Sequence, residues 1–167
     1  MGILIGYLIK IVTLPGLIID TIINKWVCDF LNIPIHHINY IPLDPEKPAI
    51  IYEIPNSYTK TWALAFFPFL LATALAISVF YIGLTWGVSI QYFFIWIGVS
   101  IGAHAFPEYS MGDLLWKQSI AEIKQGNYFA VLGIPFVGLI YGARFLHYLW
   151  LDIIYGLLLY FLVKDSI

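Results

Sequence analysis

Two long stretches of this chain carry no charged residue, and they constrain its fold more than any other feature. Residues 62–84 and 89–106 are apolar throughout most of their length. Each is close to the roughly 20 residues that an α-helix needs to cross the core of a bilayer. In the whole chain 61% of residues are hydrophobic and 11% are charged, whereas a soluble domain is about a quarter charged. The sequence therefore predicts an all-α integral membrane protein and excludes intrinsic disorder.

Two further stretches reach the length of a span, which makes about four predicted transmembrane helices in one domain, residues 1–167. The first covers about 3–24 and is interrupted by Lys10 and by Pro15–Gly16. The last covers 135–163 and would be about 43 Å long as a helix. We expect one long, tilted helix there, and a fifth span only if Gly138 and Gly142 mark a break.

The two long connections, 25–61 and 107–128, are separated by two predicted spans and so lie on the same side of the membrane. They hold five of the eight basic residues. The positive-inside rule places them in the cytoplasm and both termini outside, as in a multi-pass protein of the cell membrane. With a net charge of −2 and no basic stripe, the chain is not expected to bind nucleic acid.

Both connections contain predicted local structure. Residues 35–41 and 49–54 are rich in Ile and Tyr and are bounded by prolines, which favours a small β-hairpin at the membrane interface. Residues 111–124 alternate apolar and polar side chains at helical spacing, which predicts a short amphipathic helix.

Ionisable side chains within a span are costly, so each one is a candidate site. Asp20 and Asn24 are four residues apart and share a helix face. His104 lies near the end of the third predicted span, and Asp113 follows in the next connection. If the first and third spans end on the same side, these four residues lie at similar depth. Their oxygen and nitrogen atoms are the kinds of ligand that hold a divalent metal ion.

Structural roles are open for the same four residues. Asp20 and Asn24 are candidates for hydrogen bonds between helices, and His104 for a buried imidazole with a partner. Asp113 is also placed to cap the amphipathic helix.

A second polar group lies in the fourth stretch. Arg144, Tyr148 and Asp152 are spaced by four residues and would share one face of a continuous helix, with His147 beside them. Charges within a membrane usually pair, which favours a structural ion pair between Arg144 and Asp152, although Arg144 is also placed to extend to the interface.

Three segments in order carry a resemblance to a known family. They are LPGLIIDTIIN followed by WVCDFLNIPI over residues 14–35, GVSIGAHAFP over 98–107 with Asp113 behind it, and residues 144–155. The chain resembles small membrane metallopeptidase-like proteins of archaea and bacteria, which are loosely akin to the site-2 protease group. In these proteins a Pro-Gly break precedes a helix that bears HExxH.

The resemblance fails at the catalytic motif itself. HExxH places two His four residues apart on one metal ion, with the Glu as general base. At the matching positions this chain has Asp20, Thr21 and Asn24, so the base and both imidazoles are missing. His104 and Asp113 match positions that the family retains, and the resemblance implies Asp113 as the third ligand.

Three functions follow as expectations. The first is a metallopeptidase-like scaffold without catalysis or cofactor, an accessory subunit of a larger membrane complex such as a respiratory or other energy-converting one. The second is an active metal-dependent intramembrane hydrolase that binds zinc or another divalent metal through Asp20, His104 and Asp113, with Glu108 or a distant carboxylate as the replacement base. The third is a small transporter that uses Arg144, His147 and Asp152.

Overall fold

The computed structural model describes residues 8–42, 48–86, 88–147 and 151–167, and most of them are helical. Residues 8–12 form a short helical segment that ends in a turn at Thr13. The elements that follow are α2 (Leu14–Phe30), β1 (Ile35–Ile38), β2 (Ile50–Tyr52), α3 (Tyr58–Thr85), α4 (Val88–Ala103), α5 (Tyr109–Lys124), the 3-10 helix η1 (Tyr128–Leu132), α6 (Gly133–His147) and α7 (Leu151–Asp165). The predicted helical fold with one small hairpin is therefore confirmed.

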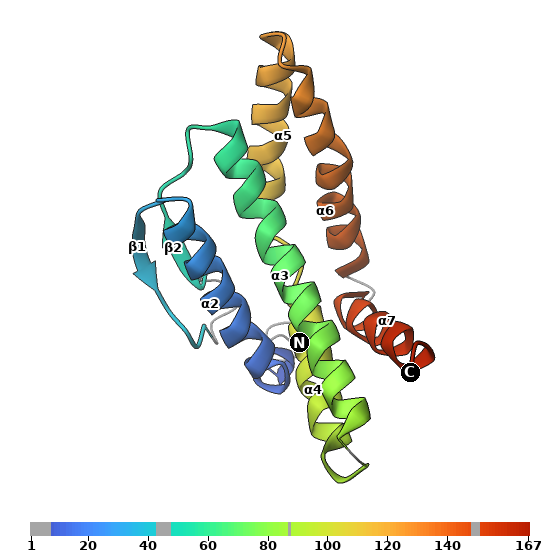
Figure 1. Ribbon diagram of the computed structural model, residues 1–167. Helices are drawn as coiled ribbons and strands as arrows, with labels where there is room; N and C mark the ends of the chain where they lie inside the picture. The colour runs from blue at the N-terminus through green and yellow to red at the C-terminus, as the bar shows by residue number, and fades with distance from the viewer. Residues whose placement is uncertain (1–7, 43–47, 87, 148–150) are drawn as a thin grey trace.

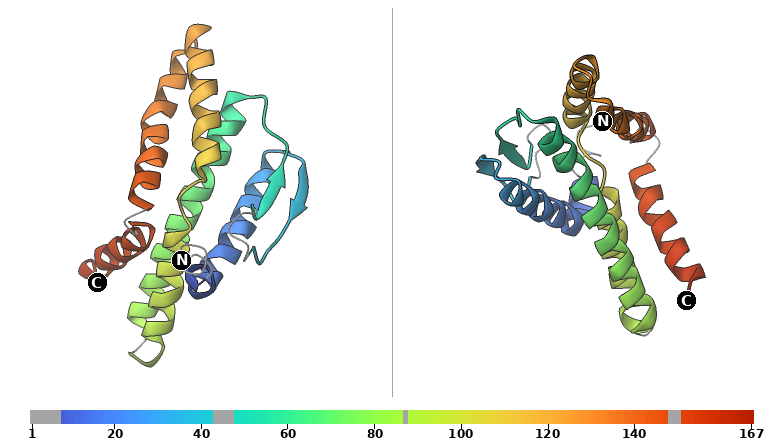
Figure 2. Two further views of the ribbon diagram at one scale, coloured as in Figure 1. Left: turned by 180° about the vertical axis from the view of Figure 1, so that it is seen from behind. Right: turned by 45° about the horizontal axis from the view of Figure 1, so that its top comes forward.

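The long helix α3 is the axis of the molecule (Figure 1). Along one side of it lie α2 and the hairpin, and α4 runs back beside its lower half. The helices α5 and α6 form an antiparallel pair that extends past the start of α3, and α7 lies across the lower half. The two further views agree with this arrangement (Figure 2).

Among the described helices, only α3 is both long and apolar enough to cross a membrane. It has 28 residues and is about 42 Å long at 1.5 Å per residue. By contrast, α4 has 16 residues and is about 24 Å long, which is shorter than the roughly 30 Å hydrocarbon core. The structure thus provides one candidate span and does not support four.

Small residues allow α4 to pack closely against its neighbours. A Cβ atom on Gly98 would lie 2.4 Å from the Phe80 ring of α3, and one on Gly102 would lie 2.7 Å from the Cα atom of Gly156 in α7. Glycines four residues apart on an apolar helix allow such close approach between helices. These contacts hold α3 and α7 against α4 within a core to which α2, α5 and α6 also contribute.

The fourth predicted stretch is two helices, so the prediction of one long helix was wrong. The helix α6 ends at His147 and α7 begins at Leu151 and runs in a different direction (Figure 1), and the residues between them lie outside those described. Gly138 and Gly142 are inside α6 rather than at a break. The change of direction lets Gly156 reach Gly102, a contact that favours two helices over one.

The local structure predicted for the two connections is confirmed. Residues 35–38 and 50–52 pair as an antiparallel two-stranded sheet, and α5 covers the predicted amphipathic segment. The sheet packs against α2, and its Tyr52 is partly buried. Its membrane depth stays a prediction.

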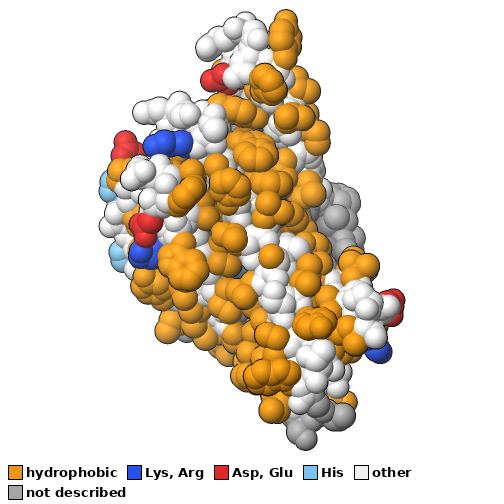
Figure 3. Space-filling view, viewed as in Figure 1, with side chains coloured by type: hydrophobic (Ala, Val, Ile, Leu, Met, Phe, Trp, Pro, Cys, Tyr) orange, Lys and Arg blue, Asp and Glu red, His pale blue; other side chains and the backbone are white. Residues whose placement is uncertain are grey.

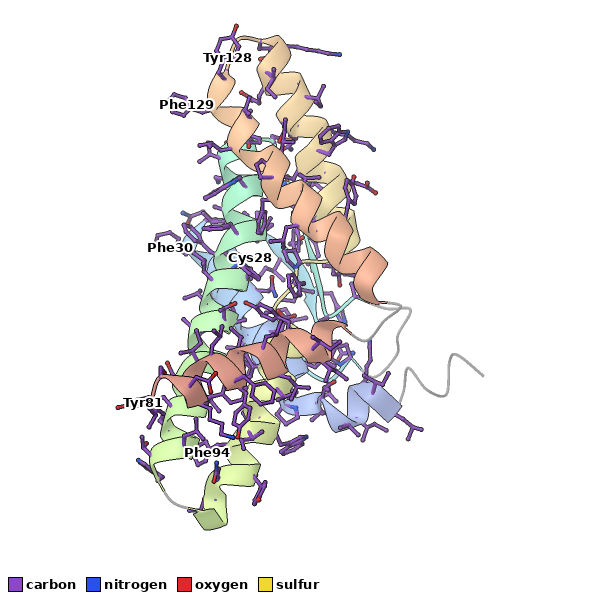
Figure 4. The ribbon with its side chains drawn as sticks, turned by 90° about the vertical axis from the view of Figure 1, so that its right-hand side faces the viewer. Cys28, Phe30, Tyr81, Phe94, Tyr128 and Phe129 are labelled. Atoms are coloured by element: carbon purple, nitrogen blue, oxygen red, sulfur yellow. The ribbon has the colours of Figure 1, made fainter. Side chains whose placement is uncertain are left out.

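The single cysteine, Cys28, is fully buried in the core at 0% exposure (Figure 4). Burial raises its pKa to about 11, so about 0.1% of it is thiolate at pH 8. We expect the folded protein to react with a maleimide at pH 8 at least about 100-fold more slowly than the protein unfolded in SDS. Equal labelling rates in the two states would contradict the burial.

Candidate functional site

The positions that match HExxH lie on α2. Pro15 stands at the start of this helix, where its missing N–H costs nothing, and the apolar residues that follow complete the helix. The Nδ2 atom of Asn24 donates to the Asp20 carboxylate at 2.8 Å and to the Asp20 carbonyl oxygen at 2.9 Å. The two polar side chains that the sequence singled out therefore satisfy one another within a single helix.

Thr21, between them, is fully buried at 0% exposure. Its Oγ1 atom donates to the Leu17 carbonyl oxygen at 2.9 Å, which is the usual way for a helical Thr to satisfy its hydroxyl. The position that the resemblance assigns to a general base is therefore a packing position.

Glu108, at the residue before α5, is linked electrostatically to both Asp20 and Tyr52 of β2. Burial first, and then the charge of Glu108, raises the pKa of Tyr52 above its usual range. We call Asp20, Asn24, Glu108 and Tyr52 the Asp20 site. Tyr52 was not predicted, because only the fold brings the hairpin to α2.

His104 lies elsewhere, at the break before α2. Its Nε2 atom shares a hydrogen bond of 2.9 Å with Thr13 Oγ1. Thr13 comes seven residues before Asp20, which is about 10 Å along a helix. His104 therefore contacts the start of α2.

His104, the residue directly after α4, continues a row of three side chains that begins on that helix. We call Trp96, Ser100 and His104 the α4 row. Trp96 Nε1 donates to the Val12 carbonyl oxygen at 2.9 Å. Ser100 Oγ donates to the Thr13 carbonyl oxygen at 2.8 Å and accepts from the Gly16 N–H at 2.7 Å. A break in an apolar helix exposes backbone groups that need partners away from water, and the α4 row supplies them.

Removal of the central hydroxyl tests this role. Ser100→Ala takes one partner each from the Gly16 N–H and the Thr13 carbonyl oxygen, and a buried backbone group left unpaired costs about 1–3 kcal/mol. We expect a loss of about 2 kcal/mol in the free energy of unfolding, measured by chemical denaturation in detergent. Ser78→Ala is the control, since Ser78 is exposed and bonds within its own helix. Equal losses in the two variants would contradict the role.

Asp113 has a third set of contacts. It lies inside α5, whose cap position is Glu108, so it is not the cap residue. Its Oδ1 atom accepts a hydrogen bond of 2.7 Å from the Tyr141 hydroxyl of α6. It therefore links the two helices of the α5–α6 pair.

The second predicted polar group spans the break between α6 and α7. Arg144 and His147 are in α6 and Asp152 is in α7, so their spacing no longer places them on one continuous helix face. The side chains of these three residues, and Tyr148 altogether, lie outside those described. Their pairing and the transporter alternative stay predictions.

Within the described part of the chain, no three His, Cys, Asp or Glu side chains gather as metal ligands would. Asp20, His104 and Asp113 instead have hydrogen-bond partners in three separate places. Comparisons with family models, curated proteins and solved structures give no match to this chain. The family resemblance stays a prediction.

Proposed function

We propose that this chain is a membrane-embedded helical scaffold with a metallopeptidase-like layout and no peptidase activity, and that it serves as an accessory subunit of a larger membrane complex. One observation carries the loss of activity. The three positions that match HExxH hold side chains that form hydrogen bonds within α2 itself: Asp20 with Asn24, and Thr21 with Leu17. A hydrolytic site needs a water-activating base and open ligand positions.

The surface supports the membrane placement and the partners. The molecule exposes 10109 Å², whereas a compact monomer of 19.1 kDa exposes about 8,400 Å². Apolar side chains cover most of the face in Figure 3, and the charges gather near its edges. Phe30, Tyr128 and Phe129 point away from the helices (Figure 4), and Phe129 is 81% exposed. Large apolar surfaces of this kind are covered by lipid or by other subunits.

Metal analysis tests the loss of activity. We expect substoichiometric zinc in the purified protein, and no change in metal content in His104→Ala or Asp113→Ala. Stoichiometric zinc that disappears in either variant would overturn the proposal in favour of the hydrolase. Glu108 beside Asp20 is the observation that favours that second function, because it brings a carboxylate to the Asp20 site.

A spin label tests the membrane placement. Leu71 on α3 and Tyr40 beside the hairpin are 47% and 43% exposed. Because Cys28 is buried, the native cysteine should not react with the spin label. In nanodiscs we expect oxygen to relax a label at Leu71→Cys more strongly than a water-soluble nickel complex does, and the reverse at Tyr40→Cys. Strong relaxation by nickel at both positions would overturn the placement.

Isolation from native membranes tests the partner. We expect the protein to keep stable companions in mild detergent. A clean monomer with no companion would contradict an accessory role.

A further inference from the structure

An open pocket of about 270 Å³ lies where α2 ends, β2 ends and α3 begins, and none of its lining residues belongs to the Asp20 site. Its polar lining comes from Asn32, Glu53, Asn56, Ser57 and Lys60. Pockets for drug-sized ligands measure about 300–1,000 Å³. The pocket is therefore suited to a small polar group.

Local hydrogen bonds fix the first wall. Asn32 has a φ of 52° in the left-handed region, which Asn tolerates better than other side chains. Its N–H donates to Asp29 O at 3.2 Å, and the Ile33 N–H donates to Cys28 O at 2.9 Å. These two bonds are the Schellman pattern that ends a helix, so the backbone that carries the Asn32 amide is held in place.

The opposite wall is fixed as well. The Glu53 N–H donates to Pro34 O at 2.9 Å, which continues the strand pairing by one bond. The Pro55 carbonyl oxygen accepts from Gln118 Nε2 at 2.9 Å. Because these backbone positions are set before any ligand arrives, little ordering is needed on binding.

The pocket presents one charge of each sign. Glu53 and Lys60 both line it and are both exposed. Over the described residues, the one ion pair is between Lys25 and Asp29, so Glu53 and Lys60 are not bonded to each other. A carboxylate accepts from an ammonium group, and a Lys ammonium binds a phosphate. The pair thus matches a ligand that carries both a phosphate and an amine.

The position of the pocket indicates where such a ligand comes from. Lys60 is in the first turn of α3, the candidate span. Because α3 is about as long as a whole bilayer with its headgroups, roughly 40–45 Å, its first turn falls in a headgroup layer. Phe30, two residues before Asn32, is 77% exposed and provides apolar surface for an acyl chain.

We propose that this pocket binds the phosphate–amine headgroup of a phosphatidylethanolamine-type lipid, with Lys60 on the phosphate and Glu53 on the amine. The choice of a lipid rests on the proposed membrane placement. The charges of Glu53 and Lys60 and the geometry of the pocket walls are independent of that placement.

Binding of short-chain dihexanoyl lipids to the full chain in detergent, followed by calorimetry, tests the site. We expect phosphatidylethanolamine to bind about fivefold more tightly than phosphatidylglycerol, which is near the upper limit for a solvent-exposed ion pair. Glu53→Gln should abolish this preference, and Lys60→Gln should weaken both lipids by about the same factor. The control Lys117→Gln, an exposed lysine on α5 outside the pocket, should change neither.

Other outcomes overturn the proposal. The site would be wrong if the two lipids bound the wild type equally. It would also be wrong if both pocket variants bound the lipids within about twofold of the wild type. Soluble glycerophosphoethanolamine serves as a second probe. If it binds as tightly as the lipid, the ligand is a soluble zwitterion and the lipid assignment is wrong. The spin label at Leu71 reports the membrane placement independently, so failure of the pocket and failure of the proposed function are distinguishable.

Discussion

Gly16→Ala is expected to be among the most damaging single-methyl additions to this protein. A Cβ atom at Gly16 would lie 2.0 Å from the Ser100 carbonyl oxygen and 2.7 Å from the Ile101 nitrogen. Both are backbone atoms of α4, so no side-chain rotation relieves the overlap and α2 must move away. That movement also breaks the bond from the Gly16 N–H to Ser100 Oγ. We expect a loss of more than about 3 kcal/mol in the free energy of unfolding, measured by denaturation in detergent.

Gly138→Ala is the matched control. Gly138 is also a helical glycine, but a Cβ atom there meets nothing within 4 Å. Because Ala favours a helix over Gly by up to about 1 kcal/mol, this variant should be neutral or slightly more stable. If Gly16→Ala were as stable as Gly138→Ala, the close contact between α2 and α4 would be wrong.

The fold was most predictable where the pattern is local. The uncharged run 62–84 predicted α3 to within four residues at its start, and the amphipathic pattern predicted α5. The division into α6 and α7 was missed because the sequence between His147 and Leu151 contains neither proline nor glycine. The contact between Gly102 and Gly156 joins segments far apart in the sequence, which no local pattern reports.

The candidate site, like the fold, was predictable only where its pattern is local. The spacing of Asp20 and Asn24 predicted a shared helix face, and their mutual hydrogen bond confirms it. His104 was predicted either as a metal ligand or as an imidazole with a partner, and its partner Thr13 depends on how α4 crosses the break. Trp96 and Ser100 were missed because neither carries a charge. Their spacing of four residues from each other and from His104 was the signal that could have found them.

Thr21→Glu restores the carboxylate that the resembled family uses as its base, and we expect it to destabilise the protein severely. Thr21 is 0% exposed, and its hydroxyl is satisfied within α2. A larger, ionisable side chain there must either be buried without a partner or displace its neighbours. Burial of a charge without a partner costs several kcal/mol, so we expect a loss of more than about 3 kcal/mol in the free energy of unfolding in detergent.

Thr21→Val separates the carboxylate from the mere loss of the hydroxyl. It keeps the branched shape and removes one hydrogen bond, so the loss should be about 1 kcal/mol. If Thr21→Glu were instead as stable as Thr21→Val, the position would open onto a cavity able to hold a carboxylate. The proposal of a non-catalytic scaffold would then lose its main support, because it depends on Thr21 being a buried packing residue. Severe loss in the Glu variant alone would mean that catalysis cannot be regained at this position without repacking the helices around it.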